Sequence, residues 1–256
     1  MTTKSNRLYG LMNHLLPFLF SVVVISCNSM PDYKISYTIP DTLQTNTATD
    51  LDKTLSNINL QDTIKKLMTI SLSKDTFEYE AFYNENSPYL LLYFKTGKLF
   101  SDKTRHAIVL YSRNDTTVVC ELYYLANNKW TNTESNISMP IDGFSPAFFS
   151  VSFDDFNFDG YNDFKANFYQ TMRVADTYGY IITFNAGNNS MTLHPETIKI
   201  PNLEIEKKNK AVFSTVNSNP NTDIENFKMI SKFAWTHGKL ELLTKKKHKL
   251  KLEKRD

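Results

Sequence analysis

Short runs of aromatic and β-branched residues, separated by turn-forming residues, set the strongest limit on the fold of this chain. From about residue 76 onward each run is only a few residues long and ends in Asn, Asp, Gly, Ser or Pro. Such runs are too short for amphipathic helices and are typical of half-buried strands joined by turns. The sequence therefore predicts a mainly β protein: a single compact antiparallel β domain built as a sandwich, a barrel or a meander.

The strand pattern runs through most of the chain after a short helix at residues 60–67. We expect strands at residues 68–72, 76–83, 89–95, 106–112, 117–125, 147–153, 164–170, 178–185, 190–194, 210–216, 228–235 and 239–244. Gly238 suits a tight hairpin between the last two. The chain shows no internal repeat and has only seven glycines, which argues against a propeller of repeated glycine turns.

The N-terminus has the layout of a bacterial export signal. Lys4 and Arg7 precede an apolar run over 15–25 that is too short to span a bilayer stably. Val24-Ile-Ser-Cys27 resembles the lipobox of bacterial lipoproteins. The resemblance implies cleavage after a signal peptide of residues 1–26 and lipidation of Cys27, with several acyl chains such as palmitate as a stable anchor. The alternatives are a secretory peptide with a chance cysteine and a buried helix.

The resemblance to a lipobox implies a protein of the bacterial cell envelope, which we expect at the outer membrane, facing either the periplasm or the surface. Residues 27–59 are rich in Thr, Asn, Asp and Ser, and we expect a flexible tether there. The β-rich domain follows over 60–244. A basic tail over 245–256 is either solvated or contacts anionic lipid or glycan. A formal net charge of +2 argues against nucleic acid as a partner.

One stretch in the middle of the chain has the spacing of a calcium-binding loop. From 155 to 163, side chains that carry oxygen occur at alternate positions: Asp155, Asn157, Asp159 and Asp163. Gly160 permits the sharp turn, and the backbone carbonyl of Tyr161 is expected to add a ligand. Calcium prefers six to eight such oxygen ligands. The alternative is a metal-free turn, since Asn, Asp and Gly also favour turns.

The residues between the expected ligands also fit this hypothesis. Phe156 and Phe158 alternate with the oxygens and are predicted to point into the core. Ala166 stands at the twelfth position, where an EF-hand has a bidentate glutamate, and the flanks are predicted strands rather than helices. The loop resembles the Asp-x-Asp/Asn-x-Asp-Gly-x-x-Asp loop of FG-GAP repeats in integrin α-subunits. That resemblance implies a calcium site without implying a propeller, because the chain has one such loop.

A wider resemblance covers the lipobox, the polar tether, the β-rich domain, this loop and the ending Phe233 to Leu240. In these features the chain is similar to bacterial periplasmic lipoproteins, some of which neutralise lysozyme-like peptidoglycan hydrolases from rival bacteria. The resemblance implies a non-enzymatic binding or inhibitor protein, anchored in a membrane by lipid. Its expected partner is a lysozyme-like protein or a cell-envelope glycan.

No assembled catalytic motif is recognised in the sequence, so we expect no enzyme. Two other functions stay open. Glu78 and Glu80 share one face of a predicted strand and resemble the carboxylate pair of a glycosidase, which would suit a polysaccharide-binding or polysaccharide-processing surface lipoprotein. The other open function is that of a structural envelope lipoprotein with no specific ligand. Cys120 lies in an apolar run and is expected to be buried and unreactive.

Overall fold

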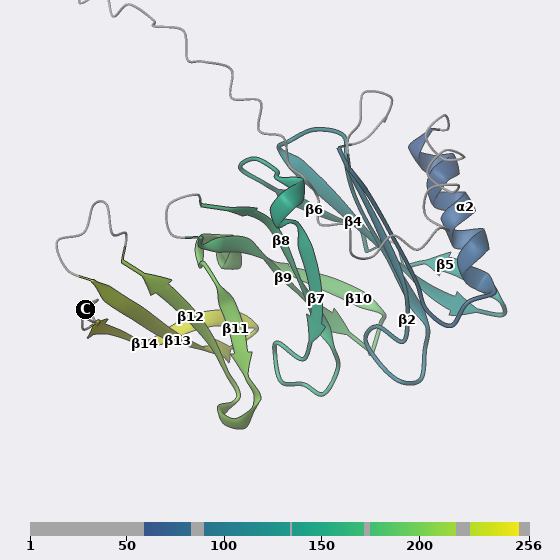
Figure 1. Ribbon diagram of the computed structural model, residues 1–256. Helices are drawn as coiled ribbons and strands as arrows, with labels where there is room; N and C mark the ends of the chain where they lie inside the picture. Colours follow the sequence, from purple (N-terminus) through teal and green to yellow (C-terminus); the bar gives the residue numbers. More distant parts are fainter. Residues whose placement is uncertain (1–58, 83–89, 134, 172–174, 219–225, 251–256) are drawn as a thin grey trace, which may run out of the picture. The chain divides into compact units, whose positions relative to one another are not determined.

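The computed structural model describes residues 59–82, 90–133, 135–171, 175–218 and 226–250. The predicted signal peptide, Cys27 and nearly all of the predicted tether lie outside these residues. The described chain forms three antiparallel sheets and one α-helix (Figure 1). The prediction of a mainly β, antiparallel fold is therefore confirmed.

The first sheet contains the strands from the first half of the domain. They are β1 (Phe77–Phe82), β2 (Leu91–Gly97), β3 (His106–Ser112), β4 (Thr117–Ala126), β5 (Lys129–Asn132) and β6 (Ile137–Pro140). The strand order is β1-β2-β3-β4-β5, and β6 also pairs with β4. Strand β3 is buried on both faces: Ala107 and Val109 join one hydrophobic cluster, whereas Ile108 and Leu110 join another. The first sheet is thus covered on both sides.

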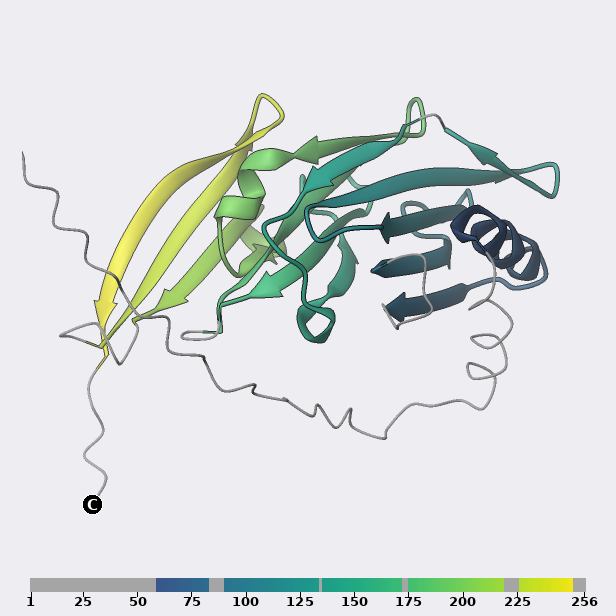
Figure 2. The same ribbon diagram turned by 90° about the horizontal axis from the view of Figure 1, so that it is seen from above.

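Helix α2 (Leu60–Leu72) covers one face of the first sheet, as Figure 2 shows from above. The side chain of Asn59 caps its N-terminus by accepting a hydrogen bond from the backbone N–H of Asp62. Apolar residues spaced three and four apart, including Leu60, Ile64 and Leu67, are buried against the sheet. The indole Nε1 of Trp130 donates to the carbonyl of Met68, 3.1 Å away, and fixes the end of the helix.

The second sheet has the order β10-β9-β8-β7 and is built from consecutive hairpins. Its strands are β7 (Ser150–Asp154), β8 (Asp163–Gln170), β9 (Thr177–Asn185) and β10 (Ser190–His194). One face contributes Phe164, Phe168 and Ile182 to the cluster that also contains Leu110 of the first sheet. These two sheets therefore share a hydrophobic core.

The third sheet packs on the other face of the second. It has the order β11-β12-β13-β14, from β11 (Leu203–Glu206), β12 (Ala211–Asn217), β13 (Phe227–Thr236) and β14 (Lys239–Lys249). Ile181 of the second sheet meets Val212, Phe233 and Leu240 of the third in a smaller cluster. The Nζ of Lys165 donates to the carbonyl of Leu203, 2.6 Å away, and joins the same two sheets.

Three features differ from the sequence-based expectations. Residues 68–72 continue helix α2 rather than forming a strand, because Met68 and Ser71 continue its buried face despite the β-branched Thr69 and Ile70. The short strands β5, β6 and β11 were not predicted. Strand β14 extends through Lys249, so the residues from Lys245 onward that were assigned to a basic tail form the second half of a strand. Residues 251–256 of that tail lie outside the described chain.

Candidate metal-binding loop

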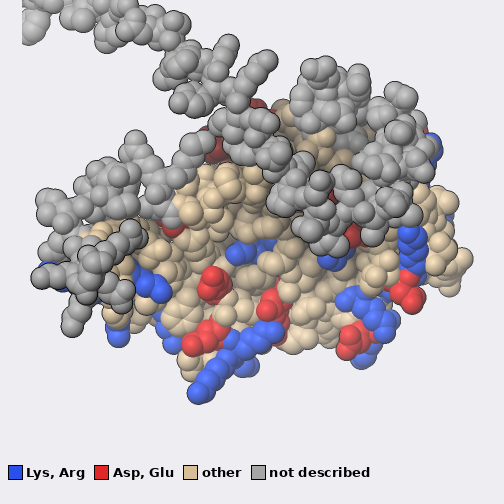
Figure 3. Space-filling model, in the orientation of Figure 1, with Lys and Arg blue, Asp and Glu red and all other residues tan. Residues whose placement is uncertain are grey.

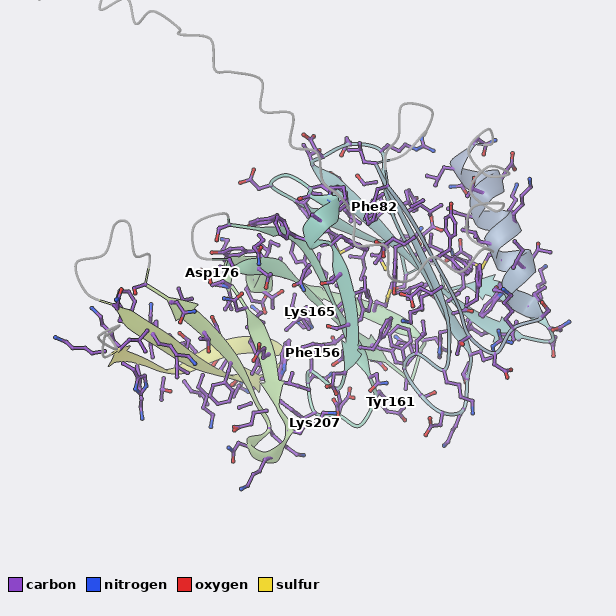
Figure 4. All side chains as sticks on the ribbon, viewed as in Figure 1. Phe82, Phe156, Tyr161, Lys165, Asp176 and Lys207 are labelled. Atoms are coloured by element: carbon purple, nitrogen blue, oxygen red, sulfur yellow. The ribbon has the colours of Figure 1, made fainter. Side chains whose placement is uncertain are left out.

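The predicted calcium loop connects β7 to β8. Asp154 pairs with Asp163 across the hairpin, so residues 155–162 form the loop that closes it. Phe156 is buried in the cluster between the second and third sheets (Figure 4). Phe158 packs against the same cluster. The expectation that these two aromatic rings point into the core is confirmed.

Side chains of the loop hold its backbone in a tight turn. The carboxylate of Asp155 accepts hydrogen bonds from the N–H groups of Asp159, at 3.0 Å, and Gly160, at 2.9 Å. The carboxylate of Asp159 accepts from the N–H of Tyr161, at 2.9 Å, and from the Nδ2 of Asn157, also at 2.9 Å. Positive φ angles of 62° at Phe158 and 94° at Gly160 let the chain turn this sharply. The loop is therefore internally hydrogen-bonded.

Asp163 is the buried member of the set, with no exposed surface. Its Oδ2 accepts from the N–H of Asn157, at 3.0 Å, and its Oδ1 accepts from the N–H of Phe184 on β9, at 2.8 Å. Burial raises the pKa of this carboxyl to about 7 against the opposing effect of the two N–H donors, and the charges of Asp159 and Asp155 raise it further. Asp163 thus connects the loop to the second sheet.

Three other contacts connect the hairpin to segments that follow β2 and β11. Asn162 donates from Nδ2 to the carbonyl of Leu99, at 3.1 Å, and from its backbone N–H to the carbonyl of Phe100, at 3.0 Å. The Nζ of Lys207, which follows β11, lies 2.8 Å from the Oδ1 of Asp154. Phe184 and Lys207 were not predicted as site residues, because nothing in the local sequence indicates contacts with residues so distant along the chain.

The structure brings Asp155, Asn157, Asp159 and Asp163 together in one loop, as their spacing predicts. Within the described residues, however, no group of three or more His, Cys, Asp or Glu side chains is placed to hold a metal ion. The carboxylate oxygens instead accept hydrogen bonds from N–H groups of the loop and, at Asp163, from the N–H of Phe184. Each of these oxygens has two lone pairs, so one hydrogen bond does not exhaust its capacity to bind a cation. The calcium site stays a prediction.

Tyr161 has the most exposed side chain among the loop's aromatic residues, with 39% of its surface exposed. Its ring lies edge-on to Phe184, with 6.5 Å between the ring centroids. Open depressions of about 420 Å³ and 530 Å³ are both lined by Tyr161 and Asp159. Polar side chains line both, including Asn157, Thr183, Asn185 and Thr192 in the first and Lys98, Ser101, Asp102 and Asn162 in the second.

The other candidate residues lie on β1. The carboxylate of Glu78 accepts a hydrogen bond from the hydroxyl of Tyr93, at 2.7 Å, and pairs with Lys95, at 2.9 Å. Burial and the neighbouring charge of Glu78 raise the pKa of Glu80. The two glutamates thus share a strand face but have different surroundings.

Cys120 is fully buried, and burial raises the pKa of its thiol. Its sulfur lies 4.0 Å from the sulfur of Met191 in the core between the first and second sheets. A thiol in this state is a poor nucleophile, in line with the expectation of an unreactive core cysteine.

Comparison with models of protein families, with curated proteins and with solved structures finds no match to the chain. In the part of the chain that the structure describes, no helix combines the length and the apolar character needed to cross a bilayer.

Proposed function

We propose that this chain is a lipid-anchored, calcium-binding lipoprotein of the bacterial cell envelope. Its β domain acts as a non-enzymatic binding or inhibitor protein, with a lysozyme-like peptidoglycan hydrolase as the partner class. The observation that carries the proposal is the β7–β8 loop, in which three aspartates and one asparagine at calcium-loop spacing surround a tight turn.

The charge of the loop supports a bound cation. Asp155, Asp159 and Asp163 lie near enough for their charges to interact, and Asp163 is buried. A divalent cation among them would offset this repulsion and would also order the turn. Because Phe156 and Phe158 pack in the core between the second and third sheets, an ordered turn would also stabilise that core. In this proposal the ion stabilises the binding domain and performs no chemistry.

Calcium binding is tested by thermal and urea unfolding of the chain from Asn28 to Asp256, which keeps every described element. Extracytoplasmic calcium modules have dissociation constants on the order of 0.1–1 mM. At a calcium concentration ten times the dissociation constant, we expect about 1.4 kcal/mol of added stability. Asp155→Asn with Asp159→Asn should remove this gain. Asp102→Asn with Asp142→Asn, outside the loop, is the matched control. A wild-type midpoint that is equal in chelator and in calcium would exclude the site.

The lipid anchor is tested separately from the calcium site. In a bacterial host, the full chain should enter the detergent phase after extraction, and Cys27→Ser should move it to the aqueous phase. An unchanged distribution of the variant would exclude Cys27 as the lipid site. This experiment does not depend on whether the loop binds calcium.

The inhibitor function is tested by adding the 28–256 chain to lysozyme-like enzymes of several classes and measuring peptidoglycan hydrolysis. We expect a stoichiometric loss of hydrolysis in calcium that is weaker in chelator. No inhibition of any class, with no complex detected by sedimentation, would contradict the inhibitor function and leave the calcium site to its own test.

A second candidate function is a carbohydrate-binding or polysaccharide-processing lipoprotein. The polar depressions beside the exposed Tyr161 ring favour glycan binding. The different surroundings of Glu78 and Glu80 favour hydrolysis by a carboxylate pair. Turnover of a polysaccharide that disappears in Glu80→Gln would establish the second candidate over the first.

A further inference from the structure

Strand β14 is the edge strand of the third sheet and carries most of its positive charge. Within the described residues it pairs with β13 alone. Strands β13 and β14 together contain seven lysines and one acidic residue, Glu241. Basic side chains are visible over the third sheet at the left of Figure 3.

These lysines lie on both faces of the sheet. Lys245 and Lys247 pair with Ser231 and Met229 of β13, whereas Lys246 pairs with Ile230. Neighbouring residues of a strand point to opposite faces, so the two sets of side chains flank the edge from both sides. A flat, negatively charged surface that approaches this edge would meet both rows of lysines.

Apolar side chains accompany the charge. Leu242 and Leu243 are each 54% exposed, and Leu250, directly after the strand, is 47% exposed. They are three of the four large hydrophobic side chains that are exposed in the described chain. Leu243 lies where the register between β13 and β14 shifts, next to the pairing of Phe233 with Leu242.

An open groove of about 410 Å³ continues this apolar surface beside the strand. Apolar side chains from β12, β13, β14 and the segment before β11 line this groove, together with Lys199 and Lys245. The apolar members are Ile200, Pro201, Val216, Phe227, Met229, Phe233 and Leu242. The groove therefore combines apolar side chains with positive charge.

We propose that the edge formed by β13, β14 and Leu250 binds the surface of an anionic lipid bilayer. Lysines attract negatively charged headgroups, and exposed leucines enter the boundary between headgroups and acyl chains. A soluble polyanion would pair with the lysines but would leave the leucines exposed to water. Protection of an edge strand against pairing, the usual role of edge lysines, explains neither the exposed leucines nor Lys228 and Lys232 on the inner strand. The proposal needs neither the calcium site nor lipid on Cys27.

The experiment measures binding of the 28–256 chain to vesicles by co-sedimentation. One set of vesicles is phosphatidylcholine, and the other is an equal mixture of phosphatidylcholine and phosphatidylglycerol. Because the 28–256 chain lacks the apolar leader and Cys27, its binding to vesicles does not depend on the lipid anchor. We expect binding to the mixed vesicles that is at least about tenfold tighter and weakens as salt is added.

Matched variants separate this edge from general charge. Replacing Lys245, Lys246 and Lys247 by Gln should weaken binding to the mixed vesicles by at least about tenfold. Replacing Lys66, Lys98 and Lys103 by Gln, which removes the same charge from exposed positions on helix α2 and the β2–β3 connection, should change it by less than about twofold. Leu242→Ser with Leu243→Ser should weaken binding to vesicles and leave binding to heparin unchanged.

Three results would overturn the proposal: equal binding to both kinds of vesicle, an equal loss in the two lysine variants, or vesicle binding unaffected by the leucine replacements. The last would assign the edge to a soluble polyanion. Circular dichroism spectra and unfolding midpoints of all variants establish that each one is folded.

Discussion

At the scale of single residues, the loop aspartates have different roles. Asp163 has no exposed surface and accepts two backbone N–H groups, whereas Asp159 is exposed and bonds only within the loop. Removing a buried acceptor leaves donors without partners, but water replaces an exposed one. The structure thus separates a residue that holds the fold from one that is available to a cation.

We expect Asp163→Ala to lower the free energy of unfolding by about 2–4 kcal/mol in chelator as well as in calcium. Asp159→Ala should cost under about 1 kcal/mol in chelator and should act mainly by removing the gain from calcium. Urea unfolding of both variants in the two conditions measures these differences. Equal losses for the two variants in chelator would contradict the separation of roles.

His106 illustrates how burial determines the pH dependence of stability. Its ring makes T-shaped contacts with the stacked rings of Phe100 and Phe184, with centroids 5.2 Å and 5.1 Å away. Its Nε2 lies 3.3 Å from the Oδ1 of Asn189. Burial lowers the pKa of His106, against the opposing contact with Asn189. Burial likewise lowers the pKa of His194, against the charge of Glu196.

A lowered pKa means that the folded state binds fewer protons than the unfolded state. The contribution of each histidine is therefore complete above the unfolded pKa of about 6.5 and declines as the pH falls below it. The raised pKa of Asp163 acts in the opposite direction over this range, but equally in the wild type and in a His106 variant. We therefore expect the free energy of unfolding of the wild type, relative to that of His106→Phe, to decrease from pH 7 toward pH 5. Urea unfolding at several pH values measures it. An unchanged slope in the variant would contradict a neutral, buried His106.

At the scale of elements, strands β8 and β9 approach each other closely at Gly179 of β9. A Cβ built there would lie 2.1 Å from the carbonyl oxygen of Ala166 on β8, and the pairing of these strands shifts register nearby, between Asn167 and Tyr169. Backbone atoms cannot move aside as a flexible side chain can. Glycine is thus required at this position by the approach of the neighbouring strand.

Gly179→Ala should therefore lower the free energy of unfolding by about 3 kcal/mol or more, since the two strands must separate. Gly187→Ala, where the added Cβ meets only the Oδ1 of Asn185 at 3.2 Å, is the matched control and should cost under about 1 kcal/mol. Thermal unfolding of both variants gives the comparison. Similar midpoints would mean that β8 and β9 are less closely packed than the structure has them.

At the scale of the whole molecule, the two tryptophans lie in different sheets, Trp130 in the first and Trp235 in the third. Trp130 fixes helix α2 to the first sheet, whereas Trp235 of the third sheet donates from Nε1 to the carbonyl of Phe156. Each therefore reports on a different core cluster. Because the second sheet contributes to the cores on both of its faces, we expect the three sheets to unfold together.

Trp130→Phe and Trp235→Phe should each lower the free energy of unfolding by about 1 kcal/mol through the lost indole hydrogen bonds. Each variant keeps one tryptophan, so its fluorescence reports on one of the two core clusters. We expect the fluorescence midpoint to coincide with the circular dichroism midpoint in both variants. Separate midpoints would show that the third sheet unfolds independently of the first.

The sequence alone determined the features that depend on spacing along the chain. Short runs of aromatic and β-branched residues between turn-forming residues predicted most strands. The spacing from Asp155 to Asp163 predicted a loop between strands with Phe156 and Phe158 turned inward. Such patterns are local, because a strand repeats every two residues and a calcium loop uses alternate positions. They need no knowledge of the neighbouring elements.

Only the tertiary structure decided what depends on contacts between distant residues. It placed residues 68–72 in a helix, because the first sheet buries the helical face of that segment. It joined Asp163 to Phe184 and Asp154 to Lys207, and it extended β14 through Lys249 by pairing it with β13. Pairing and burial are set by residues far away in sequence, and they override local preference.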